Sequence, residues 1–482
     1  MFQGTGSDVG KSLLAAGFCR ALVRRGHSVR PFKAQNMSNN AAVTPDGGEI
    51  GRAQALQARA SGVVPSTSMN PVLLKPQSDV GAQLVVLGQV RGNVPAKEYQ
   101  SVKGELLECV LESHAGLAAE ADFVVVEGAG SAAEINLRAN DIANMGFATA
   151  AGVPVVLIAD IDRGGVIANL VGTWELLEAA ERDLLRGYII NRFRGDMSLF
   201  DEGLSIISQH TNMPSFGILP FLQEAARLPQ EDAMSLESRP EGGGPGDGLK
   251  IAVPRLAHIS NFDDFDPLLA EPNVALEIIL PGKALPGDAD LVILPGSKTT
   301  MADLAFFREQ GWDVDLTTHL RRGGHLLGIC AGFQMLGRTI SDPKGMEGRP
   351  GSTDGLGLLD METTMSGEKT LKEVTGEARD GLGQVTGYEM HMGATVGEDC
   401  GRPFMNVGGK PGGAVSADGR VMGCYLHGLF AEDGFRRTFL EQLRPGAGSG
   451  LAYGVEVEEA LDELARAMEE ALDMDGLIAA AA

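Results

Sequence analysis

Cysteine is scarce in this chain, and so are the apolar segments that mark secreted or membrane proteins. The 482 residues include only five scattered cysteines, with no Cys-x-x-Cys pair. An N-terminal apolar segment of the signal-peptide type is missing, as is any uninterrupted apolar run of membrane length. We therefore expect a protein of the reducing cytoplasm, with no membrane partner.

Positive charge is also in short supply. Forty Lys and Arg residues stand against 64 Asp and Glu, which gives a formal net charge of −24 at pH 7. Such a balance argues against nucleic acid as a partner. It also means that overall charge cannot attract anionic substrates, so their sites must be local concentrations of Lys, Arg, helix ends and metal.

The pattern of apolar residues predicts an α/β protein. An apolar fraction of 44% is enough for a large core. Strand-like apolar runs alternate with helical periods in both halves, which is typical of parallel sheets covered by helices. We expect two doubly wound, mainly parallel-sheet domains. The expected strands are residues 28–33, 122–127, 153–160, 187–191 and 215–219, then 250–255, 274–280, 290–294, 325–329 and 421–426.

A polar stretch rich in Gly and Pro, residues 237–248, separates the two halves and is expected to be a linker. The domains then span residues 1–236 and 249–445. Residues 446–482 form a C-terminal extension with an acidic helix that we expect to dock on the rest of the chain. The apolar positions at helical spacing in that helix are Leu461, Leu464, Met468 and Leu472.

The N-terminus carries a phosphate-binding loop, with one residue more between its outer glycines than the standard form. In such loops the backbone amides cradle phosphates, the lysine places a charge on them and the Ser hydroxyl reaches Mg²⁺. A helix expected over residues 12–25 would direct its N-terminus at the anion. ATP with Mg²⁺ is the expected ligand. The residues expected at it are Gly4, Thr5, Ser7, Asp8, Val9, Gly10, Lys11 and Ser12.

Few residues are left for the strand that should precede this loop. Only Met1, Phe2 and Gln3 precede it, whereas strands usually run about five residues or more. We expect either a short first strand or a true start upstream of Met1.

The second half contains a cysteine in the setting of a nucleophile. Cys330 lies between Gly328-Ile329 and Ala331-Gly332, where an apolar strand ends and a helix begins. Glycines on both sides permit a strained nucleophile elbow, and the new helix favours the thiolate. An isolated cysteine is more often a buried apolar residue, by roughly two to one, but the flanking glycines favour the nucleophile. His427, after the apolar run 421–426, is the expected general base.

Residues 250–440 resemble the triad-type glutamine amidotransferases. The resemblance implies that Cys330 attacks the side-chain amide of glutamine, releases ammonia and leaves a glutamyl thioester. The segment 294–298, LPGSK, matches the family loop that helps to form the oxyanion hole. Many relatives carry a glutamate two residues after the histidine, where this chain has Leu429. The sequence therefore does not identify the residue that orients the imidazole. The expected oxyanion residues are Gly296, Ser297 and Ala331.

Longer strings resemble the cobyric acid synthase family over nearly the whole chain. The family takes adenosylcobyrinic acid a,c-diamide, a corrinoid, and amidates its b, d, e and g carboxylates with ATP and glutamine. The resemblance implies a first domain similar to dethiobiotin synthetase, which activates a carboxylate as an acyl phosphate for ammonia to displace. The strings are residues 31–40, 44–54, 70–76, 158–165, 190–195, 387–393 and 425–428.

The same resemblance implies roles in the first domain. Glu127, at a strand end, matches a carboxylate that holds Mg²⁺, with a cap or salt-bridge partner as the competing interpretation. Asp46 matches a loop acid that also reaches Mg²⁺, with Glu49 or a simple Asx-turn as alternatives. Lys33 would neutralise the acyl-phosphate transition state, with an ordinary solvated lysine as the alternative. Asn191 lies where relatives hydrogen-bond to adenine, with a strand-end cap as the alternative.

The sequence leaves the role of His391 open and offers two rival functions for the whole chain. His391 is a second catalytic histidine, a residue shaping the corrinoid side of the pocket, or a satisfied core histidine. The sibling a,c-diamide synthases share both domain types, but the strings at 35–40 and 44–54 argue against them. A nucleotide-switch ATPase with an inactive second half is disfavoured by the intact Cys330 and His427.

Overall fold

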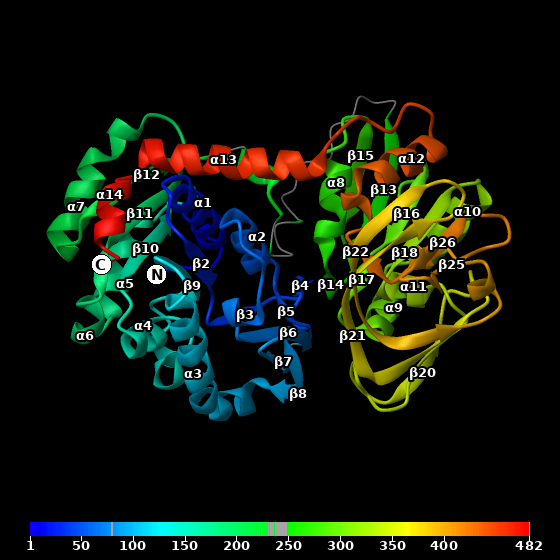
Figure 1. Cartoon of the computed structure of the whole chain (residues 1–482), viewed down its shortest axis with the longest axis horizontal. Coiled ribbons are helices and arrows are strands. Elements are labelled where there is room, and N and C mark those ends of the chain that lie inside the picture. Colours follow the sequence, from blue (N-terminus) through cyan, green and yellow to red (C-terminus); the bar gives the residue numbers. More distant parts are fainter. Residues whose placement is uncertain (79–80, 223, 230, 232–235, 237–247, 482) are drawn as a thin grey trace.

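The computed structural model has two α/β halves side by side, with the last long helix running from their border along the first half (Figure 1). The described residues are 1–78, 81–222, 224–229, 231, 236 and 248–481. Of the expected linker 237–248, residues 237–247 lie outside them. Among the described helices, none is both long and apolar enough to cross a bilayer.

The first half is built on a six-stranded parallel sheet in the order β12-β11-β10-β1-β9-β2. β1 has only three residues, Phe2–Gly4, all buried, and it pairs with β9 and β10 at the centre of the sheet. The short first strand is therefore present, and the five other expected strands are confirmed. They are β2 (Val29–Phe32), β9 (Phe123–Ser131), β10 (Val155–Asp160), β11 (Leu185–Phe193) and β12 (Ser215–Pro220).

Helices cover both faces of this sheet. Alternate residues of β10 belong to different cores, since Val156 and Ile158 pack with one set of helices and Leu157 and Ala159 with another. This agrees with the two-residue period of a strand buried on both faces. The helices are α1 (Lys11–Arg24), α2 (Arg52–Ala60), α3 (Ala96–Ala118), α4 (Met145–Ala151), α5 (Val166–Leu176), α6 (Ala179–Arg182) and α7 (Asp201–Thr211).

Between β2 and β9 the chain forms two small sheets that the sequence did not predict. One has the order β3-β6-β7-β8 and the other pairs β4 with β5. Figure 1 shows β4 and β5 at the border with the second half, where Ala41 and Val43 share a small core with Met390 of that half. The strands are β3 (Gln35–Met37), β4 (Ala41–Val43), β5 (Glu49–Gly51), β6 (Val72–Ser78), β7 (Gly81–Val86) and β8 (Gln89–Pro95).

The second half has its own six-stranded sheet, in the order β15-β13-β16-β18-β26-β25, with all pairs parallel except β25 with β26. The five strands expected here are confirmed, and with them the α/β fold class. The strands are β13 (Leu249–Pro254), β15 (Val274–Ile279), β16 (Leu291–Leu294), β18 (His325–Ile329), β25 (Ala414–Val415) and β26 (Val421–Cys424). The helices are α8 (Asp266–Leu269), α9 (Thr300–Glu309), α10 (Trp312–Arg321), α11 (Ala331–Met335) and α12 (Asp433–Leu443).

A second, mostly antiparallel sheet lies beside it and was also not predicted. Its centre is the long hairpin of β21 (Glu362–Ala378) and β22 (Gly383–Val396). β22 pairs at its other edge with β27 (Leu426–His427), which places Tyr388 directly opposite His427. The remaining strands are β19 (Thr339–Asp342), β20 (Gly351–Asp354), β23 (Met405–Val407) and β24 (Lys410–Gly412), and β14 (Ile259–Ser260) pairs separately with β17 (Gly296–Ser297).

The C-terminal extension returns to the first half. α13 (Tyr453–Ala471), drawn in red in Figure 1, runs back to α1, and α14 (Met474–Ala479) follows it. A Cβ added at Gly17 of α1 would lie 2.5 Å from Met468 Sδ, so glycine permits the close packing. Arg20 of α1 also pairs with Glu458 and Asp462, each at 2.7 Å. The expected docking helix is present.

Candidate active sites

Cys330 stands in a strained turn between β18 and α11. Its φ and ψ are 53° and −108°, a conformation that L-residues rarely adopt. A Cβ at Gly332 would lie 2.1 Å from Leu294 O, and one at Gly328 would lie 2.7 Å from the Gly332 carbonyl. Both flanking glycines are therefore needed for the turn, as the elbow interpretation requires.

His427 is oriented by an acid that the sequence did not reveal. Its Nδ1 lies 2.8 Å from Oδ2 of Asp264, and the amide of Gly428 donates to Oδ1 of the same carboxylate at 2.7 Å. Asp264 is in a 3-10 turn, Phe262–Phe265, and is 2% exposed, while His427 is 1% exposed. The only signal in the sequence was a set of aspartates among apolar residues at 262–269. Leu429, the position where many relatives carry the acid, is simply buried.

The charge around His427 favours its protonated form. Burial alone would lower the pKa of His427, but Asp264 and Cys330 outweigh it and raise the pKa to about 10. An imidazole of this kind accepts the thiol proton readily and holds it for a leaving group.

The expected oxyanion residues gather around Cys330. Ser297, Ala331 and His427 line one pocket with it. A Cβ at Gly296 would lie 3.0 Å from Cε1 of His427, so the backbone of Gly296 borders the imidazole. The Ser297 hydroxyl donates to Asp303 at 2.6 Å and accepts from the Thr299 amide at 3.0 Å. The side chain of Ser297 thus anchors its loop, which leaves the backbone as the candidate donor.

A buried lysine and a partly buried glutamate complete this pocket. Lys298 and Glu347 line it, and the Thr300 amide donates to Glu347 at 2.6 Å. Burial lowers the pKa of Lys298, with Lys75 adding to the effect, and burial raises the pKa of Glu347. One basic and one acidic group beside a nucleophile match the two charged ends of an amino acid.

His391 also lines the pocket, stacked on Tyr425 with ring centroids 3.7 Å apart. Burial lowers the pKa of His391 to about 4. At neutral pH this imidazole is therefore uncharged and a weak base, which favours His427 for proton transfer.

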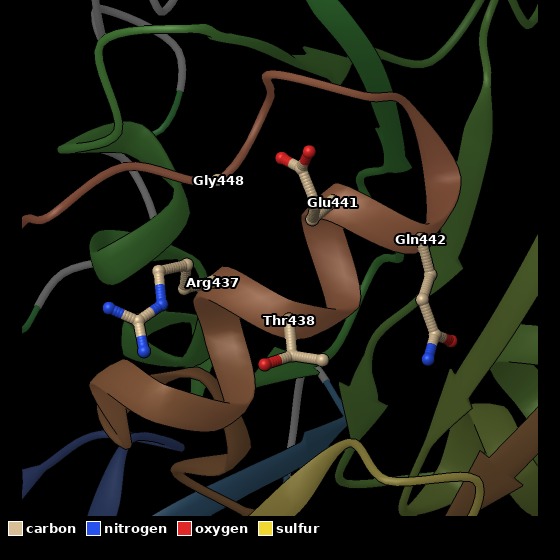
Figure 2. A pocket seen from close by; sticks show the side chains of 5 residues that line it. All are labelled: Arg437, Thr438, Glu441, Gln442 and Gly448. Carbon is tan, nitrogen blue, oxygen red and sulfur yellow. The ribbon is translucent and has the colours of Figure 1, made fainter.

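Another cavity, of about 300 Å³, lies along α12 (Figure 2). None of its five lining residues is a cysteine or histidine, and the pocket of Cys330 shares none of them. We assign it no catalytic role. Its lining is Arg437, Thr438, Glu441, Gln442 and Gly448.

The phosphate-binding loop of the first half is held in shape by its own glycines and by Asn191. Gly10 has a φ of 94°, and a Cβ there would lie 2.3 Å from Nδ2 of Asn191. That Nδ2 donates to Val9 O at 2.9 Å. Lys11 Nζ donates to Gly6 O at 3.0 Å and to Gly130 O at 2.8 Å. Asn191 therefore braces the loop, and its contact with adenine stays a prediction.

Charged side chains close around the outer side of this loop. Asp8, with a φ of 54°, pairs with Arg192 at 3.1 Å and also with Arg163. Arg192 in turn donates to Asp160 at 2.8 Å. The strings at 158–165 and 190–195 thus meet at the loop.

Glu127 joins the loop to Lys33. Its Oε1 accepts from the Ser12 hydroxyl at 2.8 Å and from Lys33 Nζ at 2.7 Å, and its Oε2 accepts from Gln57 at 2.6 Å. Glu127 is 1% exposed. Burial alone would raise the pKa of this carboxyl, but Lys33 and the hydrogen bonds hold it below its usual value. Lys33 is likewise held charged against its burial by Glu127 and Glu231.

This donor set fits Mg²⁺. An ionised carboxylate and a hydroxyl oxygen lie together at the head of the loop, and both are hard oxygen ligands. Among the residues that the structure describes, no group of three or more His, Cys, Asp or Glu could hold a metal. Mg²⁺ usually takes only one or two carboxylates and completes its shell with phosphate and water.

Asp46 and Glu49 lie elsewhere in the structure. Asp46 accepts from the amide and hydroxyl of Thr67, at 3.0 and 2.9 Å; Thr67 is 21 residues further on, so this contact is not the local bond of the Asx-turn alternative. Glu49 is fully buried between Lys75, at 2.9 Å, and Lys369 of the second half. In the described residues no hydrogen bond or ion pair joins either acid to Ser12 or Glu127. The metal role of Asp46 stays a prediction.

Comparisons with known proteins agree with this arrangement. Residues 1–236 match the CobQ/CobB/MinD/ParA nucleotide binding domain family, and residues 250–435 match the CobB/CobQ-like glutamine amidotransferase domain family. The cobyric acid synthase of Paracoccus denitrificans (strain Pd 1222) is 60% identical over 482 residues, covering 100% of this chain and 99% of that protein. The cobyric acid synthase of Hyphomonas neptunium (strain ATCC 15444) is 57% identical over 484 residues, covering 100% and 97%.

One solved structure, PurLQS from Thermotoga maritima, aligns with 45% of this chain and 98% of its own at 18% identity. Its TM-score of 0.31 is too low to add to the comparison. The matches over the full length decide the family. This chain belongs to the cobyric acid synthase family, and its nucleotide-binding and glutamine amidotransferase domains make it an amide-forming ligase.

Proposed function

We propose that this chain amidates the b, d, e and g side-chain carboxylates of adenosylcobyrinic acid a,c-diamide, with ATP and glutamine as co-substrates. The observation that carries the proposal is the joining of two sites in one chain. The Cys330, His427 and Asp264 arrangement is suited to releasing ammonia, and the loop at Lys11 is suited to activating a carboxylate. We further propose a cytoplasmic location and the domain boundaries 1–236, 249–445 and 446–482.

In the glutaminase half, His427 takes the proton of Cys330 and the sulfur attacks the side-chain amide carbon of glutamine. Backbone amides at Gly296, Ser297 and Ala331 stabilise the oxyanion. His427 then gives its proton to the amide nitrogen of the intermediate, the C–N bond breaks so that ammonia leaves, and a glutamyl thioester remains. Water hydrolyses the thioester to glutamate, with His427 again as base. Lys298 and Glu347 are suited to holding the α-carboxylate and α-amino groups of glutamine.

In the synthetase half, the loop amides and Lys11 hold the phosphates of ATP, while Lys33 neutralises charge as a substrate carboxylate oxygen attacks the γ-phosphorus. Ammonia then displaces phosphate from the acyl phosphate, which forms the amide. Ser12, Glu127 and Asp46 are the proposed ligands of Mg²⁺. When bound, the ion would neutralise charge on the phosphates.

The direct test is mass spectrometry of cobyrinic acid a,c-diamide, in its adenosylated form, incubated with the protein, glutamine and MgATP. We expect stepwise conversion of four carboxylates to amides. Glutamine and ATP consumption without any change of the corrinoid would contradict the proposed substrate.

We predict that Asp264→Asn lowers the glutaminase kcat by about 10²- to 10⁴-fold, as for the orienting acid of other triads. Because Asp264 raises the pKa of His427, loss of the charge lowers that pKa. The imidazolium of His427, which protonates the leaving nitrogen, then loses its proton at lower pH. The alkaline limb of the pH–rate profile should therefore move to lower pH.

The matched control is Asp315→Asn, at an aspartate of the same half that accepts from the Leu285 amide at 3.0 Å. This control should leave both rate and pH profile unchanged. An Asp264→Asn protein with a normal kcat and profile would show that Asp264 does not orient His427.

A further inference from the structure

Arg52, the first residue of α2, reaches from the nucleotide-binding half into the glutaminase half. Its Nη2 donates to the Tyr388 hydroxyl at 2.6 Å and lies 3.0 Å from Oδ2 of Asp263. The same nitrogen donates to Ala41 O at 3.1 Å. The Arg52 side chain is only 16% exposed, so these contacts are largely shielded from water.

Both partners of Arg52 in the glutaminase half are neighbours of the proposed triad. Tyr388 is opposite His427 in the β22–β27 pair, and the two rings stack with centroids 5.3 Å apart and planes 19° from parallel. Asp263 directly precedes Asp264 in the chain. Asn261 donates to the Tyr388 hydroxyl at 2.8 Å and so ties this ring to the Asp264 turn.

Charge gives Arg52 a second effect on this turn. Asp263 and Asp264 are adjacent beside one histidine, and their side chains are 12% and 1% exposed. Two neighbouring carboxylates repel each other, and a buried charge without a partner is costly. The guanidinium of Arg52 balances Asp263, which leaves Asp264 free to pair with His427.

The other part of α2 contacts the proposed metal site. Gln57 donates to Glu127 at 2.6 Å and to Ser12 O at 3.3 Å. Gln54 lies 3.4 Å from the same carboxylate. α2 has nine residues, so one short, rigid element touches the surroundings of His427 at its start and those of Glu127 along its length.

We propose that Arg52 is a positioning residue supplied by the nucleotide-binding half to the glutaminase triad, and that α2 links its position to the state of the ATP site. This rests on the proposed glutaminase role of Cys330 and His427. Arg52 holds the Tyr388 ring and the Asp264 turn against His427. A shift of α2 on binding of MgATP at Ser12 and Glu127 changes that hold, so that glutamine is hydrolysed efficiently only when a carboxylate can be activated.

The test is Arg52→Gln in the full chain, with glutaminase rates measured with and without MgATP plus the corrinoid a,c-diamide. We expect the glutaminase kcat to fall at least about tenfold, a change within the usual range of coupling between two sites. We also expect its stimulation by the synthetase substrates to disappear. Synthesis from ammonium salts should stay within about twofold of wild type, since Arg52 touches no group of the ATP site. Tyr388→Phe, which removes only the hydroxyl that Arg52 binds, should change glutaminase in the same direction.

The matched control is Arg20→Gln. The side chain of Arg20 is 17% exposed and makes two ion pairs with α13, and neither partner belongs to the glutaminase half. It should leave both the glutaminase rate and its stimulation unchanged.

Two outcomes would overturn the inference. One is an Arg52→Gln protein with normal glutaminase and normal stimulation. The other is an equal loss of glutamine-dependent and ammonia-dependent synthesis, which would mark Arg52 as merely structural. A Cys330→Ala protein is assayed in parallel, because full glutaminase activity in that variant would instead contradict the proposed function.

Discussion

Replacing Cys330 by alanine is expected to abolish glutamine-dependent amidation and to leave ammonia-dependent amidation near the wild-type rate. Without its proposed nucleophile the glutaminase should lose about 10⁴-fold or more in rate, as other covalent catalysts do. The synthetase half needs only free ammonia. Corrinoid amide formation is measured with glutamine and, separately, with an ammonium salt.

Cys424→Ala provides a close control. Cys424 is 1% exposed on the neighbouring strand β26, and burial raises the pKa of its thiol to about 12, so it remains a thiol. This variant should keep both activities. Equal loss with both nitrogen sources in Cys330→Ala would mean that the cysteine is structural.

Glu127→Gln is expected to lower amidation by several orders of magnitude with either nitrogen source and to raise the Mg²⁺ requirement. Glutamine keeps the shape of the side chain but removes the charge that a hard cation requires. Initial rates over a Mg²⁺ titration, with ammonia as donor, measure the effect without the glutaminase step.

The structure adds a stability effect to this prediction. Lys33 is buried and pairs with Glu127 at 2.7 Å, so removal of the charge should cost up to about 3–5 kcal/mol of unfolding free energy. Activity must therefore be measured on protein shown to be folded. Glu181→Gln is the control, since this buried acid closes a capping box on α6 where glutamine also serves. A Glu127→Gln protein with normal rate and normal Mg²⁺ dependence would refute the metal assignment.

Local patterns in the sequence were enough to predict the strands of the two central sheets and the two turns to which we assign the chemistry. β10 is buried at every position and apolar at all but its last, Asp160, because both faces of the strand are covered, and such a run can be recognised in the sequence. The elbow at Cys330 is equally local, because glycines within two residues make the strained backbone possible. The loop at Lys11 depends on residues that are contiguous in the chain.

The tertiary structure alone decided which distant groups meet. Asp264 and His427 are 163 residues apart, and no periodicity links them, because a triad needs only the final positions of its side chains. The β21–β22 hairpin was not predicted because much of it is exposed or half-buried, so its sequence contains no long apolar run that would indicate a strand. That hairpin brings Tyr388 to His427 and to Arg52, a residue more than 330 positions earlier. Chain order places the two halves one after the other, whereas packing between them makes α2 of one half a neighbour of the proposed triad in the other half.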